Sequence, residues 1–171
     1  MTDAELLKPV DVFLSIGSNI NPEANIQYAL SEIDQFFEIK QISSVYRNKS
    51  VGFKGDDFLN MVVKLNTIRS PFEILKELNR IESATGREIG TGTFDSRTLD
   101  IDMILYGDLV DPEEPLKLPR KDIDLYSFVI GPLAEIEPRG VHPVSEKSFI
   151  ELWEEFNREK HPLERISIRF D

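Results

Sequence analysis

Two aspartates, Asp100 and Asp102, lie one residue apart in an otherwise apolar stretch, within the segment FDSRTLDIDMILYG of residues 94–107. Alternate side chains of a strand point to opposite faces, so both carboxylates share a face. The pattern predicts a core face of Leu99, Ile101, Met103 and Leu105 and a second face of Asp100, Asp102, Ile104 and Tyr106. With α-carbons ~6–7 Å apart, the carboxylates can converge on one or two hard cations, which offset their repulsion. The alternative is a solvent-facing pair in salt bridges with nearby arginines.

Several basic residues accompany these aspartates. Arg87 and Arg97 flank the glycine-containing loop that leads to them, and Lys117, Arg120 and Lys121 follow. Arginines around two carboxylates suit a metal-bound polyphosphate, because the metal joins the carboxylates to phosphate oxygens and the guanidinium groups take the remaining charge. The same arginines could instead serve only to neutralise the excess of aspartate.

An amide and an aromatic ring on another predicted strand suggest a binding site for a flat ring. Asn60 follows Phe58 by two residues, so the two side chains share a face of the predicted strand. Such a pair suits a flat heterocycle, with hydrogen bonds at its edge and stacking on its surface. A buried asparagine satisfied by backbone groups is the competing interpretation. Asn79 and Glu82, on the last turns of a predicted helix, are either solvated or line a pocket.

Composition limits the classes of partner. The chain has 171 residues, which fits a single domain spanning 1–171, and a formal net charge of −11, which disfavours binding to nucleic acid or an anionic membrane. It has no cysteine and two histidines, which argues against thiolate and histidine-rich metal sites. No signal peptide or membrane-spanning run is visible, so we expect a cytoplasmic protein.

Apolar periodicity and turn residues predict the elements that position these side chains. Strands are expected at 11–17, 39–47, 58–68 and 98–106. One helix follows Pro22, and another starts at Ser70-Pro71 with Glu73 completing a capping box, carries Phe72, Leu75, Leu78 and Ile81 on its apolar side, and ends near Gly86. The order βαββαβ predicts an α+β, ferredoxin-like sandwich, followed by a loop-rich extension with short helices near 129–136 and 148–159.

The sequence resembles the 6-hydroxymethyl-7,8-dihydropterin pyrophosphokinase family along nearly its whole length. The matching segments, in family order, are LSIGSNI, SSVYRN…VG…DDFLN, RIESATGR, SRTLDIDMILYGD and LPRKDIDLYSFVIGPLAEIEP. The resemblance implies transfer of diphosphate from ATP to the hydroxymethyl group of the pterin, with release of AMP, in folate biosynthesis. It also implies a monomer or a small homo-oligomer that works on two small molecules.

The resemblance assigns roles residue by residue. Asp100 and Asp102 would hold two Mg²⁺ ions, and Arg87 and Arg97 would stabilise the transferring group. The other residues implied for the ATP co-substrate are Asn79, Glu82, Lys117, Arg120 and Lys121. Those implied for the pterin are Asn48, Val51, Phe58, Asn60, Phe94 and Phe128.

The chain departs from the family at several of its positions. Arg120 stands where the family usually has histidine, Tyr126 where it has arginine, and Ile89 where a basic residue is common. These changes motivate a first alternative, a non-catalytic homologue that binds pterin or nucleotide. Asn48-Lys49-Ser50 replaces a Thr-x-Pro loop and motivates a second, a related diphosphotransferase with a different acceptor or nucleotide.

Overall fold

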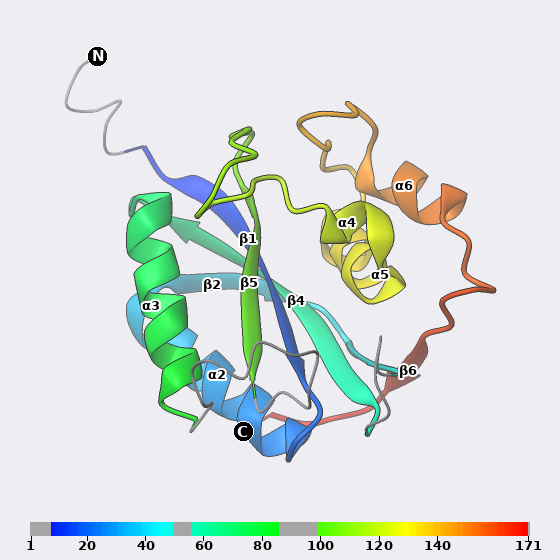
Figure 1. Cartoon of the computed structure of the whole chain (residues 1–171), viewed down its shortest axis with the longest axis horizontal. Coiled ribbons are helices and arrows are strands. Elements are labelled where there is room, and N and C mark those ends of the chain that lie inside the picture. Colours follow the sequence, from blue (N-terminus) through cyan, green and yellow to red (C-terminus); the bar gives the residue numbers. More distant parts are fainter. Residues whose placement is uncertain (1–7, 50–55, 86–98, 171) are drawn as a thin grey trace.

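A computed structural model describes residues 8–49, 56–85 and 99–170, and shows one twisted sheet with helices on both faces (Figure 1). The long central strands are β1 (Val10–Ser18) and β4 (Phe58–Thr67), which pair antiparallel along their full length. β5 (Asp100–Tyr106) pairs with the other side of β1 and lies at the edge.

The other side of β4 pairs with two short strands, β2 (Glu38–Ile42) and β3 (Val45–Asn48). One strand over 39–47 was predicted, and that prediction is wrong at Ser43. The Ser43 hydroxyl accepts the N–H of Val62 at 2.9 Å, a hydrogen bond that a strand carbonyl would otherwise accept, so the ladder is interrupted there. Counting β2 and β3 as one strand, the order 4-1-3-2 confirms the ferredoxin-like class.

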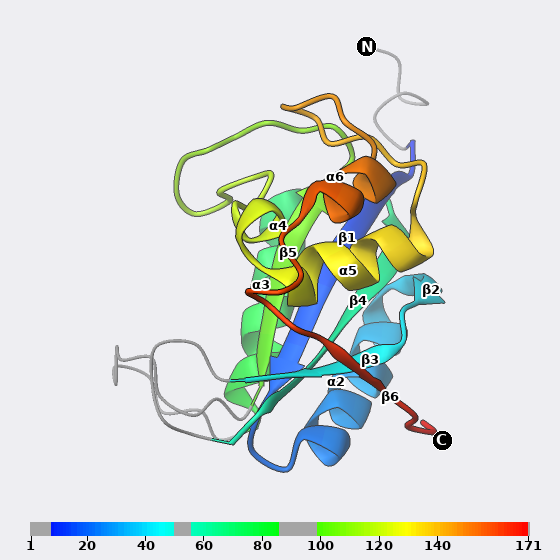
Figure 2. The same ribbon diagram turned by 90° about the vertical axis from the view of Figure 1, so that its right-hand side faces the viewer.

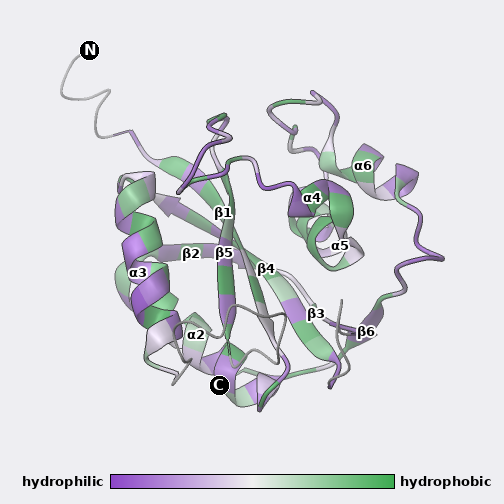
Figure 3. Cartoon of the chain, in the orientation of Figure 1, coloured by the Kyte–Doolittle hydropathy of each residue, from purple (hydrophilic) through white to green (hydrophobic). Residues whose placement is uncertain are grey.

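α2 (Pro22–Phe36) and α3 (Pro71–Ser83) cover one face of the sheet, as predicted. The Ser70 hydroxyl accepts the N–H of Glu73 and caps α3. The predicted apolar side of α3 is wrong at Phe72, which is 58% exposed. The residues that pack on the sheet are Ile74, Leu78 and Ile81, spaced four and three residues apart, and this stripe leaves Phe72 on the outer side. Figure 3 shows hydrophobic and hydrophilic residues on different sides of α3.

The opposite face is covered by α4 (Asp122–Leu125), α5 (Ser127–Ile136) and α6 (Phe149–Glu155). α5 contains the predicted stretch 129–136. α6 ends four residues before the predicted end at 159, because Phe156 takes an extended backbone and packs on Trp153. No helix within the described ranges is long and apolar enough to cross a membrane.

A bulge in β5 changes the predicted faces at the end of this strand. Leu14 lies opposite Met103 and Phe13 opposite Leu105, so Ile104 is the extra residue. The predicted alternation holds as far as Ile104, which lies on the α5 side with Asp100 and Asp102. Beyond the bulge Leu105 joins the cluster under α5, and Tyr106 turns to the α2–α3 side, the reverse of the prediction.

The C-terminal segment forms an unpredicted strand, β6 (Glu164–Ile166), which pairs with the free edge of β3. Figure 2 shows the chain passing from α6 across α5 to β6 and the C-terminus. Leu163 lies against Gly131 of α5, and Ile166, Ile168 and Phe170 pack on the core beneath α2 and α3. We call residues 156–170 the C-terminal strap, because they contact α5, β3 and the core in turn.

Candidate functional site

A row of side chains crosses three strands on the face that α5 covers. Asn60 of β4 lies opposite Gly17 of β1, and Gly17 lies opposite Asp100 of β5. Partners in an antiparallel ladder share a face, so Asn60 and Asp100 lie on the same side with one strand between them, ~10 Å apart. The next row along the sheet is Val62, Ser15 and Asp102. The register therefore brings together the two groups that the sequence singled out.

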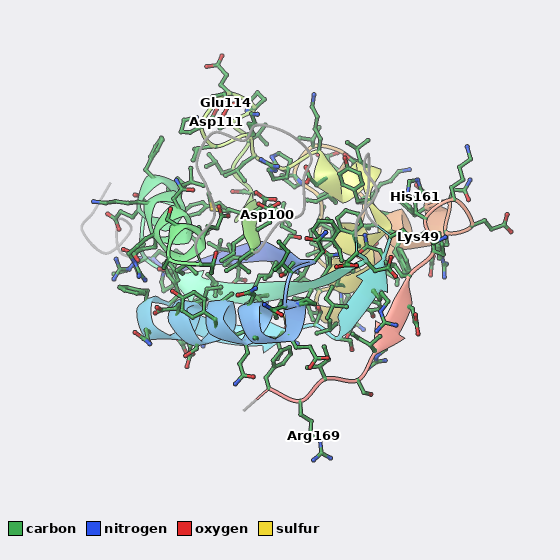
Figure 4. The ribbon with its side chains drawn as sticks, turned by 60° about the horizontal axis from the view of Figure 1, so that its bottom comes forward. Lys49, Asp100, Asp111, Glu114, His161 and Arg169 are labelled. Carbon is green, nitrogen blue, oxygen red and sulfur yellow. The ribbon has the colours of Figure 1, made fainter. Side chains whose placement is uncertain are left out.

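This face of the sheet is divided into an apolar half and a polar half. Phe13, Val62, Ile104 and Leu105 form the apolar half and pack against the helices. The polar half follows toward Gly17 and begins with Asp102 and Asp100, both of intermediate exposure. Figure 4 shows Asp100 near the middle of the molecule, well separated from Asp111 and Glu114. A few polar groups beside an apolar wall are the typical lining of a ligand pocket.

Arg120 is the basic side chain that the described structure places at these aspartates. Its Nη2 is 3.9 Å from Oδ2 of Asp102, and its Nε is 3.5 Å from Oδ1 of Asp122. Its backbone N–H donates to the carbonyl of Ile104, the bulged residue, at 3.0 Å. The bulge thus fixes the start of the α4 segment beside Asp102. The alternative interpretation expected the aspartates to form salt bridges with arginines, and Asp102 does form an ion pair with Arg120.

Asn60 is buried, with 4% of its surface exposed, and its amide is held by another side chain rather than by backbone groups. Asn60 Nδ2 donates to Oδ1 of Asn48, and Nδ2 of Asn48 donates to the Lys49 carbonyl at 3.0 Å. Asn48 lies opposite Phe58 in the ladder, so three of the six predicted pterin-side residues, Asn48, Phe58 and Asn60, are neighbours. The amide of Asn60 is oriented before any ligand is present.

Gly17 provides the space for that amide. A Cβ at residue 17 would lie 2.5 Å from Oδ1 of Asn60, closer than real Cβ atoms approach oxygen. Gly17 was not among the residues predicted for the site. Its signal, a glycine at the end of a strand, is shared with ordinary turns.

The start and end of α5 both contribute to this region. Phe128, in the first turn, stacks on Tyr126 with ring centroids 4.9 Å apart and an angle of 14°. Glu135, in the last turn, accepts hydrogen bonds from the Ser44 N–H at 3.0 Å, the Ser44 hydroxyl at 2.8 Å and the Tyr46 hydroxyl at 2.7 Å. Burial and this hydrogen bond raise the pKa of Tyr46 to about 12. Tyr46 lies opposite Asn60, so Glu135 fixes α5 to the strand beside the row.

Other predicted residues lie at the margins. Glu82, at the end of α3, accepts the N–H of Ile101 at 2.8 Å and so holds the edge strand between the two aspartates. Asn79 is exposed on α3, and Lys121 is exposed at the start of α4. Lys117 forms an ion pair with Glu114 at 2.5 Å. Within the described ranges, none of these last three side chains forms an ion pair or a hydrogen bond with Asp100 or Asp102.

Four predicted residues, Val51, Arg87, Phe94 and Arg97, lie outside the described residues. Among the residues that are described, no group of three or more His, Cys, Asp or Glu side chains could hold a metal ion. Asp100 and Asp102 by themselves offer two hard oxygen ligands. That set fits a cation such as Mg²⁺, which usually keeps several waters or phosphate oxygens beside one or two carboxylates.

A hollow of about 580 Å³ lies at the other end of the sheet, lined among others by Phe37, Thr67 and Arg69. None of its lining residues belongs to the polar half described above. It is separate from the row that joins Asn60 to Asp100.

The sequence matches a model of the family described as 7,8-dihydro-6-hydroxymethylpterin-pyrophosphokinase (HPPK) over residues 13–138. A 2-amino-4-hydroxy-6-hydroxymethyldihydropteridine pyrophosphokinase of Aquifex aeolicus is 36% identical over 138 residues, covering 80% of this chain and 86% of the relative. One of Haemophilus influenzae is 36% identical over 141 residues, covering 80% and 88%.

Solved structures show the same fold. A crystal structure of Plasmodium falciparum HPPK-DHPS with SDX-DHP superposes with a TM-score of 0.72 at 12% identity, covering 94% of this chain and 48% of that chain. The described ranges of this chain and that structure thus share an architecture despite little sequence identity.

Proposed function

The chain belongs to the 7,8-dihydro-6-hydroxymethylpterin-pyrophosphokinase family, and we propose that the row from Asn60 to Asp100 is its active site. The family's reaction joins the diphosphate of ATP to the hydroxymethyl oxygen of 6-hydroxymethyl-7,8-dihydropterin and releases AMP, in folate biosynthesis. The bond from the hydroxymethyl oxygen to the β-phosphorus forms, the bond from that phosphorus to the oxygen of AMP breaks, and the hydroxyl proton is released.

The observation that supports this proposal is the distance across the row. A flat heterocycle held at Asn60 extends its substituent over Gly17 toward Asp100, a span of ~10 Å that suits a bicyclic ring and its side group. The absence of a side chain at Gly17 leaves room for the Asn60 amide at the start of this span. The catalytic contribution is then positioning of two substrates rather than a covalent nucleophile.

At the pterin end, we assign Asn60 to the polar edge of the ring. Its orientation by Asn48 is set before binding, so little ordering entropy is lost. Phe58, opposite Asn48, and Phe128, at the start of α5, are the rings assigned to stacking. Val51 and Phe94 are assigned to the same ligand by family resemblance alone.

At the phosphate end, Asp100 and Asp102 would hold the expected pair of Mg²⁺ ions, which when bound supply positive charge to the phosphate oxygens. The carboxylates hold their positions through the β5 backbone, and Glu82 fixes that backbone at Ile101. Arg87 and Arg97 are assigned to the transferring group, and Asn79, Lys117, Arg120 and Lys121 to the nucleotide side.

We also propose that residues 1–171 work as one domain, although the family match ends at residue 138. Support comes from the C-terminal strap, because Leu163 packs on Gly131 of α5 and β6 extends the sheet. The strap thereby holds the helix that carries Phe128 against the sheet that carries Asn60.

The function is tested by incubating the protein with ATP, Mg²⁺ and 6-hydroxymethyl-7,8-dihydropterin and identifying the products by mass spectrometry. We expect AMP and a pterin that has gained a diphosphate group, in equal amounts. Binding of the pterin without AMP would favour the non-catalytic homologue instead. AMP formed only with another acceptor or nucleotide from a panel would favour the altered diphosphotransferase.

A further inference from the structure

Arg120 and Asp102 form an ion pair at the proposed metal position, and this pair has a consequence for the order in which ligands bind. We propose that Arg120 is a resident cation that occupies Asp102 until a metal–nucleotide complex arrives, and that its guanidinium then turns to the phosphates. The proposal rests on the function proposed above. It makes Arg120 a specificity-determining residue that selects metal-bound polyphosphate over the free metal ion.

The backbone of Arg120 is fixed while its side chain is loosely held. Its N–H donates to Ile104 at 3.0 Å and its carbonyl accepts from the N–H of Ile123 at 3.2 Å, so β5 and α4 hold the main chain from both sides. The guanidinium, however, lies 3.9 Å from Asp102 and 3.5 Å from Asp122, beyond the usual length of a charge-assisted hydrogen bond. A side chain with these contacts can leave Asp102 without any change in the backbone.

Charge makes Arg120 and a free metal ion competitors. A dication at Asp102 would repel a guanidinium about 4 Å from the same carboxylate, and both groups are only partly exposed, at 27% and 34%, so water screens this repulsion incompletely. A metal ion that brings a polyphosphate removes the conflict, because phosphate oxygens offer the guanidinium a bidentate partner. Arg120 therefore weakens the binding of the metal alone and strengthens the binding of the metal with nucleotide.

An arginine side chain can compete with a free metal ion for Asp102 over the whole ordinary range of pH. It stays protonated at any ordinary pH, whereas the histidine usual at this family position is largely neutral at pH 7. The competition is thus a property of this chain. An Arg120→His variant should lose most of it at pH 8.

The test measures binding rather than turnover. Mn²⁺ serves as the probe and is titrated by electron paramagnetic resonance, without nucleotide, into the wild-type chain, Arg120→Gln and Arg120→His. We expect Mn²⁺ to bind about three- to tenfold more tightly to Arg120→Gln. In parallel, calorimetry should show a nonhydrolysable ATP analogue with Mg²⁺ binding about tenfold more weakly to the same variant.

Two controls distinguish the effect of the Arg120–Asp102 ion pair from the effect of removing one positive charge anywhere on the protein. Lys147→Gln removes one positive charge from an exposed ion pair with Glu155, and it should leave Mn²⁺ affinity at the wild-type value. When Arg120→Gln is introduced into an Asp102→Asn chain, it should not raise the Mn²⁺ affinity above that of Asp102→Asn alone, because the shared carboxylate is gone.

The proposal is overturned if Arg120→Gln binds Mn²⁺ no more tightly than the wild-type chain, or if its affinity for the nucleotide analogue is unchanged. Failure of the proposed function gives a different result, namely a wild-type chain that forms no AMP with pterin. Because the Mn²⁺ titration needs no catalysis, the two failures are distinguished.

Discussion

Gly17 and Asn60 face each other across β1 and β4, and the amide of Asn60 occupies the space that a side chain at residue 17 would need. Since Nδ2 of Asn60 is held by Asn48, the amide cannot turn away without losing a buried hydrogen bond. The orientation of the proposed pterin-binding group therefore depends on a glycine in the neighbouring strand.

Gly17→Ala should weaken pterin binding about tenfold while leaving binding of the ATP analogue unchanged. The new Cβ would lie 2.5 Å from Oδ1 of Asn60 and must displace it, whereas Asp102 is not touched. Crowding in a packed sheet should also lower the free energy of unfolding by about 1–2 kcal/mol. Calorimetry with each ligand and urea unfolding measure both effects.

An Asn60→Ala background provides the matched control for this change. Without the amide the clash is removed, so Gly17→Ala should cost clearly less stability there than in the wild-type chain. An equal cost in both backgrounds would show that Gly17 does not act through Asn60.

Glu135→Ala should loosen α5 from β3 and lower the free energy of unfolding by about 1 kcal/mol, because Ser44 and Tyr46 lose their acceptor at a partly exposed position. The affinity for pterin should fall with it, since Phe128 is carried by the same helix. Denaturant unfolding and pterin titration check the two effects. Glu135→Gln keeps the size of the side chain and one acceptor oxygen, so it should lose less stability and less pterin affinity than Glu135→Ala. A larger loss in Glu135→Gln than in Glu135→Ala would contradict this account.

The pH dependence of stability should reflect Tyr46. Its pKa is raised from the ordinary tyrosine value of 10.0 to about 12, by burial first and by Glu135 second. The unfolded chain releases this proton near pH 10 while the folded chain keeps it, so the contribution is complete below pH 10 and is lost as the pH rises toward 12. An ultraviolet titration should find this late tyrosine in the wild-type chain and an earlier one in Glu135→Gln. No difference between the two would exclude Glu135 as a cause.

Removal of residues 162–171 should destabilise the fold by about 2–3 kcal/mol and promote association. The deletion removes Leu163 from α5, exposes the edge of β3, and uncovers the core that Ile166, Ile168 and Phe170 protect. Thermal unfolding and light scattering check this. As a control, Arg169→Ala alters an exposed strap residue and should leave both unchanged.

The sequence predicts most of the sheet because local signals and tertiary packing agree there. The apolar runs of β1 and β4, and the Ser70-Pro71 start of α3, appear in the structure close to where they were expected. Asp100 and Asp102 share a face as period-two alternation requires, since the bulge comes after them.

The features that the sequence did not predict depend on contacts between segments far apart in the chain. The residues around Ile104 show no sequence pattern that predicts a bulge. The bulge depends on the pairing with β1 and on the hydrogen bond from the N–H of Arg120. β6 has only three residues and exists because β3 offers an open edge. The hydrogen bonds from Ser44 to Glu135 join residues 91 positions apart in the chain, and no pattern in a single sequence predicts such a contact. The site residues Val51, Arg87, Phe94 and Arg97 stay predictions from the sequence.

The most direct test of the site is pterin-dependent AMP release by the wild-type chain and by Asp102→Asn, compared at saturating Mg²⁺. We predict AMP from the wild-type chain and a loss of at least about a thousandfold in the variant, since a lost metal ligand removes several kcal/mol of transition-state stabilisation. The melting temperature without ligand should change little, because Asp102 is partly exposed. A variant that keeps the wild-type rate would contradict the assignment of Asp102 and the site built around it.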